Sequence, residues 1–514
     1  MKLFLVILLL LNFPLVFSGE NNFQKIANNT HFPGAFDLYF VLEKNNIILD
    51  KKDAKTIWES HFEINNKIQR LSHHMSDHSL PYEYDSHVPL IFYSPTRVKK
   101  GNSDKQVDTA SLIPTLTESL KIAPPPYALS PALTEWQKDK MMNRPKAILV
   151  FIMDAGGELY WKTHYRFSNF FKTLHDEGFV YSNAQLNFGI SGTAPSHAVF
   201  GTGTYPKYNH VHDNRPFVSA LQRSENIYQG VAGYDPMQLA QPTLIDLWNK
   251  SSALTANVLV YAGASRAAIG MAGHGSLYAK DSQNLVFWYD SKLGKFDTEK
   301  KAYALPFGLE KFSYNDYIKL NNESEYWKSA NCSPQGMSDS DCIQSSPAFA
   351  QMEGDVLINT LSKRQFGLGP TTDLIFINFK GTDYCGHRFG VESMECRETF
   401  LKIENQIERI TKLINDKTQG DYLMAFSADH GMSRPIELEG GSIIISEEIL
   451  EVLNKTFGKK DDLAPVISNF GKTYINVNLP QLKKNGYTLN DIKNFLESYK
   501  LSDKKVFKEV MVFE

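Results

Sequence analysis

Three short segments of the chain are almost continuously apolar, and each one is followed by small, polar or acidic residues. They are residues 147–153, 374–379 and 423–427. A strand with one wet face would alternate apolar and polar residues, so continuous runs favour strands buried on both faces of a parallel sheet. Residues 395–413 instead repeat their apolar positions with helical spacing. This segment predicts a helix.

The alternation of such strands and helices predicts an α/β fold, with a mostly parallel central sheet between helices. In folds of this class, ligands bind beyond the carboxyl ends of the strands. Asp154 follows the first apolar run directly, and Asp383 and Asp429 come shortly after the second and third. The sequence therefore predicts that three carboxylates gather at one edge of the sheet.

The chain divides into segments of different composition. Residues 1–18 combine an early lysine, an apolar run and small residues, which is typical of a cleaved signal peptide and predicts an exported protein, periplasmic or secreted. That run is shorter than the roughly 20 residues that span a bilayer, and no membrane span is expected in the mature chain. Residues 124–145 begin with three prolines and predict a surface linker. Residues 146–514 form the predicted main domain, with an inserted cap at about 205–350.

The chain of 514 residues carries 54 Lys and Arg against 57 Asp and Glu, a formal net charge of -3. A nucleic-acid-binding domain usually has an excess of basic residues, so no nucleic-acid partner is expected. In an oxidising compartment the four cysteines permit three pairings. Proximity in the sequence favours Cys332–Cys342 and Cys385–Cys396. The oligomeric state is left open.

Carboxylates and imidazoles occur together at two of the strand ends. Asp383 and His387 are four residues apart, which places both on one face if a helix begins there, and His430 follows Asp429 directly. This mixture of ligands suits zinc or a similar divalent ion. Each residue alone also has a structural explanation, as a helix N-cap or a buried histidine. Their recurrence at successive strand ends favours a metal site.

Thr193 is a candidate nucleophile. It lies two residues before Pro195, which suits the first turn of a helix. Its hydroxyl would then lie at or near a helix N-terminus, where anions bind. A metal ion beside it would lower the hydroxyl pKa. The alternative is that Thr193 only caps the helix.

Taken together, these motifs resemble those of the alkaline phosphatase superfamily, in particular the bacterial phosphate-irrepressible alkaline phosphatases and the nucleotide pyrophosphatase/phosphodiesterases. Residues 193–214 resemble the nucleophile motif of that superfamily, and residues 150–157, 379–395 and 427–432 resemble its metal motifs. The resemblance implies an alkaline-phosphatase-like sandwich. It also implies an exported, metal-dependent hydrolase that acts on small phosphate esters.

One metal ligand of that superfamily has no counterpart at the expected place in this sequence. Relatives carry a further histidine after the Asp-His pair, but residues 431–514 contain none. Residues 77–90 resemble the missing motif, with His78 at the ligand position. The resemblance therefore implies a circular permutation, in which residues 19–123 correspond to the carboxyl-terminal part of the family. The alternative is an unrelated amino-terminal domain in which His78 is incidental.

The resemblance also assigns roles to individual residues. Two divalent metal ions, zinc in most relatives, would be held by two sets of ligands with Thr193 at or between the ions: Asp383, His387 and His78 in one set, and Asp154, Asp429 and His430 in the other. Thr193 would form a phospho-threonine intermediate during the hydrolysis of a phosphate monoester.

Substrate preference is less constrained. Asn214 and Arg266 match residues that bind the phosphoryl group in relatives, but Ala264 stands where monoesterases carry a lysine. Lys280 is a candidate to compensate for this missing cation. A diester carries less negative charge than a monoester, so a phosphodiesterase or nucleotide pyrophosphatase is the alternative function. A non-catalytic phosphate-binding pseudoenzyme is a third hypothesis.

Overall fold

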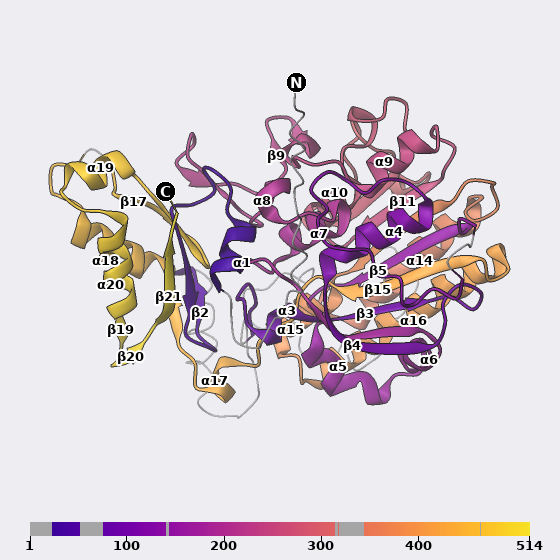
Figure 1. The fold of residues 1–514 in the computed structure, drawn as a ribbon, viewed down its shortest axis with the longest axis horizontal. Coiled ribbons are helices and arrows are strands. Elements are labelled where there is room, and N and C mark those ends of the chain that lie inside the picture. The colour runs from indigo at the N-terminus through magenta and orange to yellow at the C-terminus, as the bar shows by residue number, and fades with distance from the viewer. Residues whose placement is uncertain are drawn as a thin grey trace, which may run out of the picture.

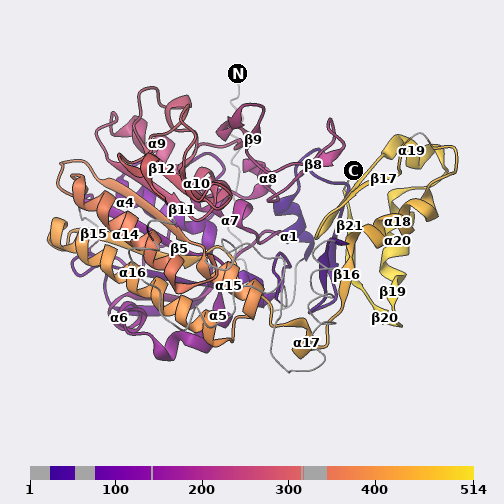
Figure 2. The ribbon, with the colours of Figure 1, turned by 180° about the vertical axis from the view of Figure 1, so that it is seen from behind.

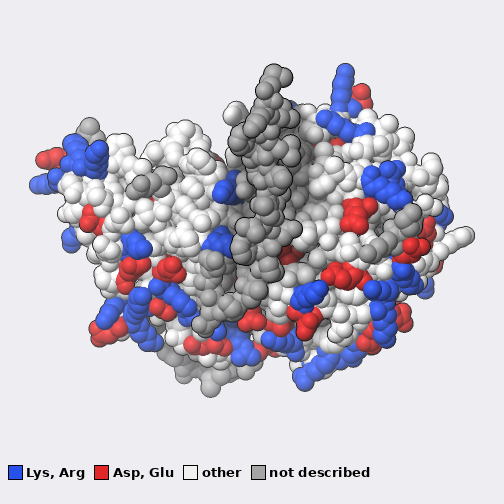
Figure 3. All heavy atoms as spheres, viewed as in Figure 1, with Lys and Arg blue, Asp and Glu red and all other residues white. Residues whose placement is uncertain are grey.

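The computed structural model describes residues 23–51, 76–139, 143–313, 317, 344–462 and 464–513. These residues form two lobes that lie side by side (Figures 1 and 2). The larger lobe is built on a sheet of nine strands, and the smaller lobe on a sheet of four. Figure 3 shows that acidic and basic side chains are interspersed over the visible face.

The central sheet of the larger lobe is mostly parallel. From one edge to the other, its strands are β13 (Lys295–Asp297), β12 (Leu285–Asp290), β11 (Val258–Ala262), β14 (Asp373–Phe379), β5 (Ala147–Met153), β15 (Tyr422–Ala428), β3 (His87–Tyr93), β6 (Phe179–Gln185) and β4 (Gly101–Asp108). The five strands from β12 to β15 are parallel to one another, whereas β13 and β3 are antiparallel to their neighbours. The three predicted apolar strands are β14, β5 and β15, which are adjacent at the centre. The predicted fold class is confirmed.

The three central strands end at the same level. Met153 at the end of β5 pairs with Phe379 of β14 on one side and with Ala428 of β15 on the other. The residues that follow these strands therefore leave the sheet side by side at its carboxyl edge, where ligands bind in this class of fold.

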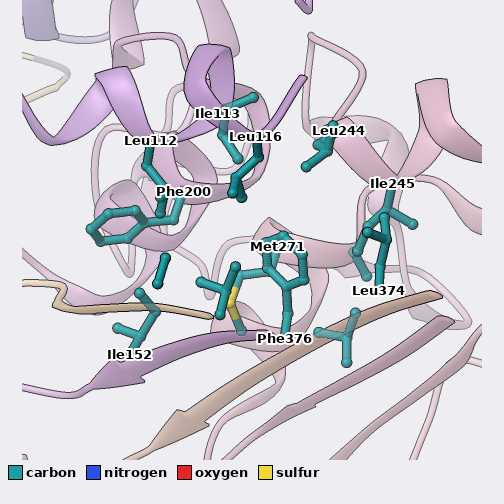
Figure 4. Close-up of a cluster of buried hydrophobic side chains, with 14 of the residues drawn as sticks. Leu112, Ile113, Leu116, Ile152, Phe200, Leu244, Ile245, Met271, Leu374 and Phe376 are labelled. Atoms are coloured by element: carbon teal, nitrogen blue, oxygen red, sulfur yellow. The ribbon is translucent and has the colours of Figure 1, made fainter. Parts of the chain in front are cut away.

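Helices cover both faces of the central sheet, because successive side chains of each buried strand point to opposite faces. One face is covered by α4 (Leu112–Leu120), α7 (Thr193–Thr202), α9 (Leu244–Ser251) and α10 (Ser265–Ala272), and the other by α5 (Glu158–His164), α6 (Phe170–Glu177), α14 (Pro347–Lys363) and α16 (Met394–Thr418). In β5, Val150 belongs to the first core and Phe151 to the second. Figure 4 shows the first core, where Leu112 and Phe200 from the helices lie over Ile152. The helix predicted at 395–413 lies within α16.

The smaller lobe joins distant parts of the chain and was not foreseen from the sequence. Its antiparallel sheet has the order β17 (Ile467–Phe470), β18 (Tyr474–Val477), β1 (Leu38–Leu42) and β21 (Phe507–Val512), and its helices are α1 (Phe23–Thr30), α18 (Ser446–Phe457), α19 (Leu479–Lys484) and α20 (Leu489–Ser498). Leu38 of β1 pairs with both Ile475 and Val512. The first and last described strands therefore belong to one sheet, with a shared apolar core.

The remaining elements are short. They are α3 (Glu83–Ser86), α8 (Pro206–Asn209), α15 (Gly381–Phe389), α17 (Ile436–Glu439), β2 (Ile47–Leu49), β7 (Phe217–Val218), β8 (Arg223–Ser224), β9 (Gln229–Gly230), β10 (Gly233–Tyr234), β16 (Ile443–Ile445), β19 (Lys500–Leu501), β20 (Lys504–Lys505) and the 3₁₀ helices η1 (Thr109–Ser111), η2 (Tyr165–Phe167), η3 (Pro236–Gln238), η4 (Gly275–Leu277) and η5 (Leu309–Lys311).

The predicted cap at 205–350 and the predicted linker at 124–145 both differ from a separate segment outside the core. The region 205–350 supplies β11, β12 and β13 to the central sheet and α9 and α10 to its cover, so these elements belong to the core and not to a cap. The described part of 124–145 contains no helix or strand, but Leu133 and Trp136 are buried. Trp136 stacks on Phe92 of β3. The segment predicted as a surface linker is therefore anchored to the lobe by two buried side chains.

Other predictions fall outside what is described or stay open. The predicted signal peptide at 1–18 and the predicted Cys332–Cys342 pair lie outside the described residues. Among the residues that the structure covers, no helix is both long and apolar enough to cross a membrane. The circular permutation and the other predicted domain boundaries stay predictions.

Candidate functional site

Two carboxylates lie next to each other where β5 and β15 end. Asp154 follows β5 and Asp429 follows β15, and both side chains are fully buried. Ala155 donates its backbone N–H to Asp429 Oδ1 at 2.9 Å. Burial and the nearby charge of Asp154 together raise the pKa of Asp429 well above its usual value. Two buried carboxylates this close favour the binding of a cation.

His430 completes an inner ligand set with Asp154 and Asp429. Its Nε2 atom lies 3.6 Å from Asp154 Oδ1 and 3.5 Å from Asp429 Oδ2. Neither His430 Nε2 nor Asp429 Oδ2 has a hydrogen-bond partner, although both atoms are buried. His430 Nδ1 donates to Gly431 O at 2.8 Å, which leaves Nε2 as the free lone pair. Ligand atoms around a tetrahedral zinc ion are about 3.3 Å apart, so the inner set fits such an ion.

An outer ligand set consists of Asp383, His387 and His78. Asp383 Oδ1 lies 3.4 Å from His387 Nε2 and 3.7 Å from His78 Nε2. Both imidazoles donate through Nδ1 to a backbone carbonyl, His78 to Ser191 O and His387 to Ser76 O, each at 2.9 Å. Their Nε2 lone pairs therefore face Asp383 Oδ1, a buried atom without a hydrogen bond. These two distances to Asp383 Oδ1 suit donors around a divalent ion, and the donor atoms of His78 and Asp383 also lie within 4.8 Å of a donor atom of His430.

The local structure explains how the outer set is held. Asp383 and His387 lie one turn apart in α15, which begins just after β14. A disulfide joins Cys385 of α15 to Cys396 of α16, with a Cα–Cα distance of 5.5 Å, and this is the pairing that proximity favoured. His78 comes from the amino-terminal part of the chain, and its ring stacks on His430 with centroids 3.9 Å apart. The two ligand sets are therefore adjacent.

Thr193 is the first residue of α7, and Gly192 occupies the N-cap position. Thr193 is therefore not the residue that caps this helix. Its hydroxyl instead lies 3.2 Å from the ammonium group of Lys380. Asn214 Oδ1 accepts a hydrogen bond from the N–H of Ala194 at 2.8 Å, which holds the amide beside the helix N-terminus. The predicted nucleophile and the predicted phosphoryl-binding amide are thus neighbours.

Arg266 lies in the first turn of α10, the helix that packs against α7. Its Nε atom is buried and has no hydrogen-bond partner. Ala264 is the N-cap residue of α10 and is also buried. Lys280 is exposed, and a different lysine supplies the positive charge at this site.

Sequence reasoning missed Lys380. Its ammonium group donates to Asp383 Oδ2 at 2.7 Å, to Asp154 Oδ1 at 2.9 Å and to Thr193 Oγ1 at 3.2 Å, and the residue is fully buried. Burial alone would lower the pKa of Lys380, but the charges of Asp154 and Asp383 outweigh it and raise that pKa. Two signals in the sequence point to it: Lys380 directly follows a central strand and lies three residues before Asp383.

His197 is a second buried residue that the sequence did not single out. Its Nδ1 atom donates to Thr193 O at 2.7 Å and lies 3.4 Å from Asp429 Oδ2. Burial lowers the pKa of His197 to about 4, so the ring is neutral near pH 7. It links the first turn of α7 to the inner ligand set.

Comparison with known proteins places this geometry in a family. Residues 148–471 match the family described as type I phosphodiesterase / nucleotide pyrophosphatase. The chain belongs to this family. The match covers the strand ends, Thr193 and α15, whereas His78 lies before it.

Several alkaline phosphatases resemble this member of the type I phosphodiesterase / nucleotide pyrophosphatase family. PafA of Elizabethkingia meningoseptica is 22% identical over 349 residues, which are 58% of this chain and 62% of PafA. PhoV of Synechococcus elongatus is 25% identical over 339 residues, which are 56% of this chain and 59% of PhoV. The chain thus spans about three fifths of the length of these relatives.

A crystal structure of a PafA variant has a similar fold. Its TM-score is 0.57 at 17% identity, and the superposition covers 72% of this chain and 85% of the PafA chain. At this identity the likeness concerns the fold: an α/β sandwich with a large, mostly parallel central sheet.

Proposed function

We propose that this protein is an exported, metal-dependent phosphatase that hydrolyses phosphate monoesters through a phospho-threonine intermediate on Thr193. The observation that carries the proposal is the pair of ligand sets near the Thr193 hydroxyl, each with a buried carboxylate oxygen that lacks a hydrogen-bond partner: Asp429 Oδ2 in the inner set and Asp383 Oδ1 in the outer set. Two divalent ions, zinc in the simplest case, would occupy the inner and outer sets. When bound, such ions activate a hydroxyl nucleophile and stabilise the charge on attacking and leaving oxygens.

The side chains of this protein would perform the following steps. Thr193 Oγ1 loses its proton to solvent and attacks phosphorus, the bond from phosphorus to the alcohol oxygen breaks, and the alcohol leaves with a proton taken from solvent. The N-terminus of α7 favours the negative charge of the phosphoryl group, while Asn214 and Arg266 hold its oxygens. A water molecule then loses a proton and attacks phosphorus on the side opposite Thr193 Oγ1. The bond from phosphorus to Oγ1 breaks, Oγ1 regains a proton, and inorganic phosphate is released. Of the three buried carboxylates, Asp154 and Asp383 pair with Lys380, and no ion pair between Asp429 and a lysine or arginine is seen among the described residues. The carboxylates outnumber this one ammonium group, so the charge of the site favours divalent cations.

The circular permutation is part of this proposal. His78 belongs to a segment that precedes the family match, yet its Nε2 atom lies 3.7 Å from Asp383 Oδ1. The same segment supplies β3 to the central sheet, beside β15. His78→Ala should therefore lower the number of bound metal ions and the turnover rate. Unchanged metal content and turnover would mean that His78 is incidental.

A phosphodiesterase is the second candidate function, and one observation favours it. Ala264 at the N-cap of α10 has no charge to offer a doubly charged monoester, and the family description names phosphodiesterases and nucleotide pyrophosphatases. Lys380 instead favours a phosphatase that acts on monoesters, because its ammonium group, just after the end of β14, contacts the Thr193 hydroxyl. The balance between these charges decides the preferred substrate.

A matched pair of substrates tests both functions. We would measure kcat/KM for 4-nitrophenyl phosphate and for bis(4-nitrophenyl) phosphate with zinc-loaded protein. Thr193→Ala should reduce kcat/KM for the preferred substrate by about 10³-fold or more. Thr202→Ala, at the far end of the same helix, is the matched control and should retain activity. A preference for the diester would favour the phosphodiesterase, and loss of both activities with bound metal would favour a pseudoenzyme.

A further inference from the structure

A lysine inside a cluster of metal ligands is unusual, because its ammonium group competes with metal ions for the same carboxylates. Lys380 has no exposed surface and contacts one carboxylate from each ligand set, Asp154 of the inner set and Asp383 of the outer set. The position of this charge decides what each set can bind.

Asp154 and Asp383 differ in whether the oxygen that contacts Lys380 also faces a histidine. Asp383 uses Oδ2 to accept from Lys380 and keeps Oδ1 for His78 and His387. The outer set therefore keeps a free carboxylate oxygen while the lysine is in place.

In the inner set, Lys380 and His430 approach the same carboxylate oxygen. Asp154 Oδ1 accepts from Lys380 Nζ at 2.9 Å, and the same oxygen faces His430 Nε2 at 3.6 Å. The other oxygen, Asp154 Oδ2, accepts from Asn378 Nδ2 at 3.2 Å. A metal ion in the inner set would therefore have to share Asp154 Oδ1 with an ammonium group, and the two positive charges repel each other.

The lysine has little room to withdraw. A Cβ atom added at Gly263 would lie 2.6 Å from Lys380 Cβ and 3.4 Å from Glu353 Oε1. The backbone at the end of β11 therefore passes close to the base of this side chain. Glu353 Oε1 is itself engaged by the hydroxyl of Tyr261. These contacts hold the base of the side chain, while its buried ammonium group is held by Asp154, Asp383 and Thr193.

We propose that Lys380 makes the two metal sites unequal, with a tight outer site at Asp383, His387 and His78 and a weak inner site at Asp154, Asp429 and His430. This inference rests on the proposed function, because it assumes that both sets bind divalent ions. The affinities of the two sites for zinc should differ by at least about a hundredfold, since the lysine opposes only the inner ion directly. The inner ion is then the exchangeable one, and activity would depend on added metal.

Zinc retention by matched variants tests this inference. Wild type, Lys380→Met and Lys363→Met would be loaded with zinc, passed through gel filtration in metal-free buffer, and analysed for zinc by mass spectrometry. Methionine keeps the length of the side chain but removes its charge, and Lys363 is an exposed lysine in the last turn of α14. Wild type and Lys363→Met should retain about one ion per chain, and Lys380→Met about two.

The outcomes separate the two ideas. An equal, non-zero number of ions in wild type and Lys380→Met overturns the role of Lys380 and leaves a metal-dependent hydrolase intact. The absence of zinc from folded wild type and from folded Lys380→Met overturns both. If Lys380→Met does not fold, a zinc titration of wild type against a chelator decides: two classes of site at least about a hundredfold apart support the proposal, and two equal sites refute it.

Discussion

The crossing of α7 and α10 sets the distance between the predicted nucleophile and Arg266, and Gly201 makes this crossing possible. All ten residues of α7 are buried, and Thr193 lies at its N-terminus. Arg266 lies near the N-terminus of α10. A Cβ atom at Gly201 would overlap the carbonyl oxygen of Gly270 and would lie 3.1 Å from Met271 Cα. Gly201→Ala should therefore push the two helices apart.

Two effects of Gly201→Ala oppose each other. Alanine is favoured over glycine in the interior of a helix by about 1 kcal/mol. Against this, an added methyl group in a tightly packed core costs about 1–3 kcal/mol or more. The upper end applies here, because the obstructing atoms belong to the backbone of Gly270 and cannot change rotamer. We expect a net loss of about 2 kcal/mol in the free energy of unfolding.

The same substitution should affect catalysis. Relief of the overlap needs a shift of about 1 Å, and a shift of this size near reacting groups lowers the rate by about 10²-fold. Urea unfolding gives the stability, and kcat/KM for 4-nitrophenyl phosphate gives the activity. Gly369→Ala is the matched control, because a Cβ there has only one neighbour within 4 Å, at 4.0 Å. If Gly201→Ala matched wild type in both measurements, the account of the helix crossing would be refuted.

Three further predictions concern other parts of the molecule. Replacing both Cys385 and Cys396 by serine should lower the free energy of unfolding by about 3 kcal/mol, as expected for a short loop, and urea unfolding with and without reductant would measure this. Burial alone would lower the pKa of His274, but the hydrogen bond and charge of Asp246 raise it above 6.5. The resulting stabilisation is complete below pH 6.5 and is lost as the pH rises through the raised pKa, so the loss of stability between pH 6 and pH 9 should be smaller in His274→Gln than in wild type. Dialysis against a chelator should abolish turnover and zinc should restore it, whereas turnover that survives complete metal removal would contradict metal dependence.

The local pattern of the sequence determined the central part of the fold. Continuous apolar runs predicted β5, β14 and β15, because a strand with helices on both faces needs apolar side chains at every position. Asp154 and Asp429 were identifiable because a carboxylate at or shortly after the end of such a run lies at the edge where ligands bind. The helical spacing of 395–413 predicted α16 for a similar reason, since one face of that helix packs against the sheet.

The tertiary structure alone decided the features that depend on contacts between distant segments. The smaller lobe pairs β1 with β21, and no local periodicity specifies the partner of a strand. Ala264 suggested a missing cation, and Lys280 was the candidate to replace it, but the parallel register of β14 and β5 brings Lys380 to Asp154 instead. The physical reason is the same in both cases: sequence patterns report which side of an element is buried, whereas the choice between two lysines depends on which backbones lie within a few ångströms of each other.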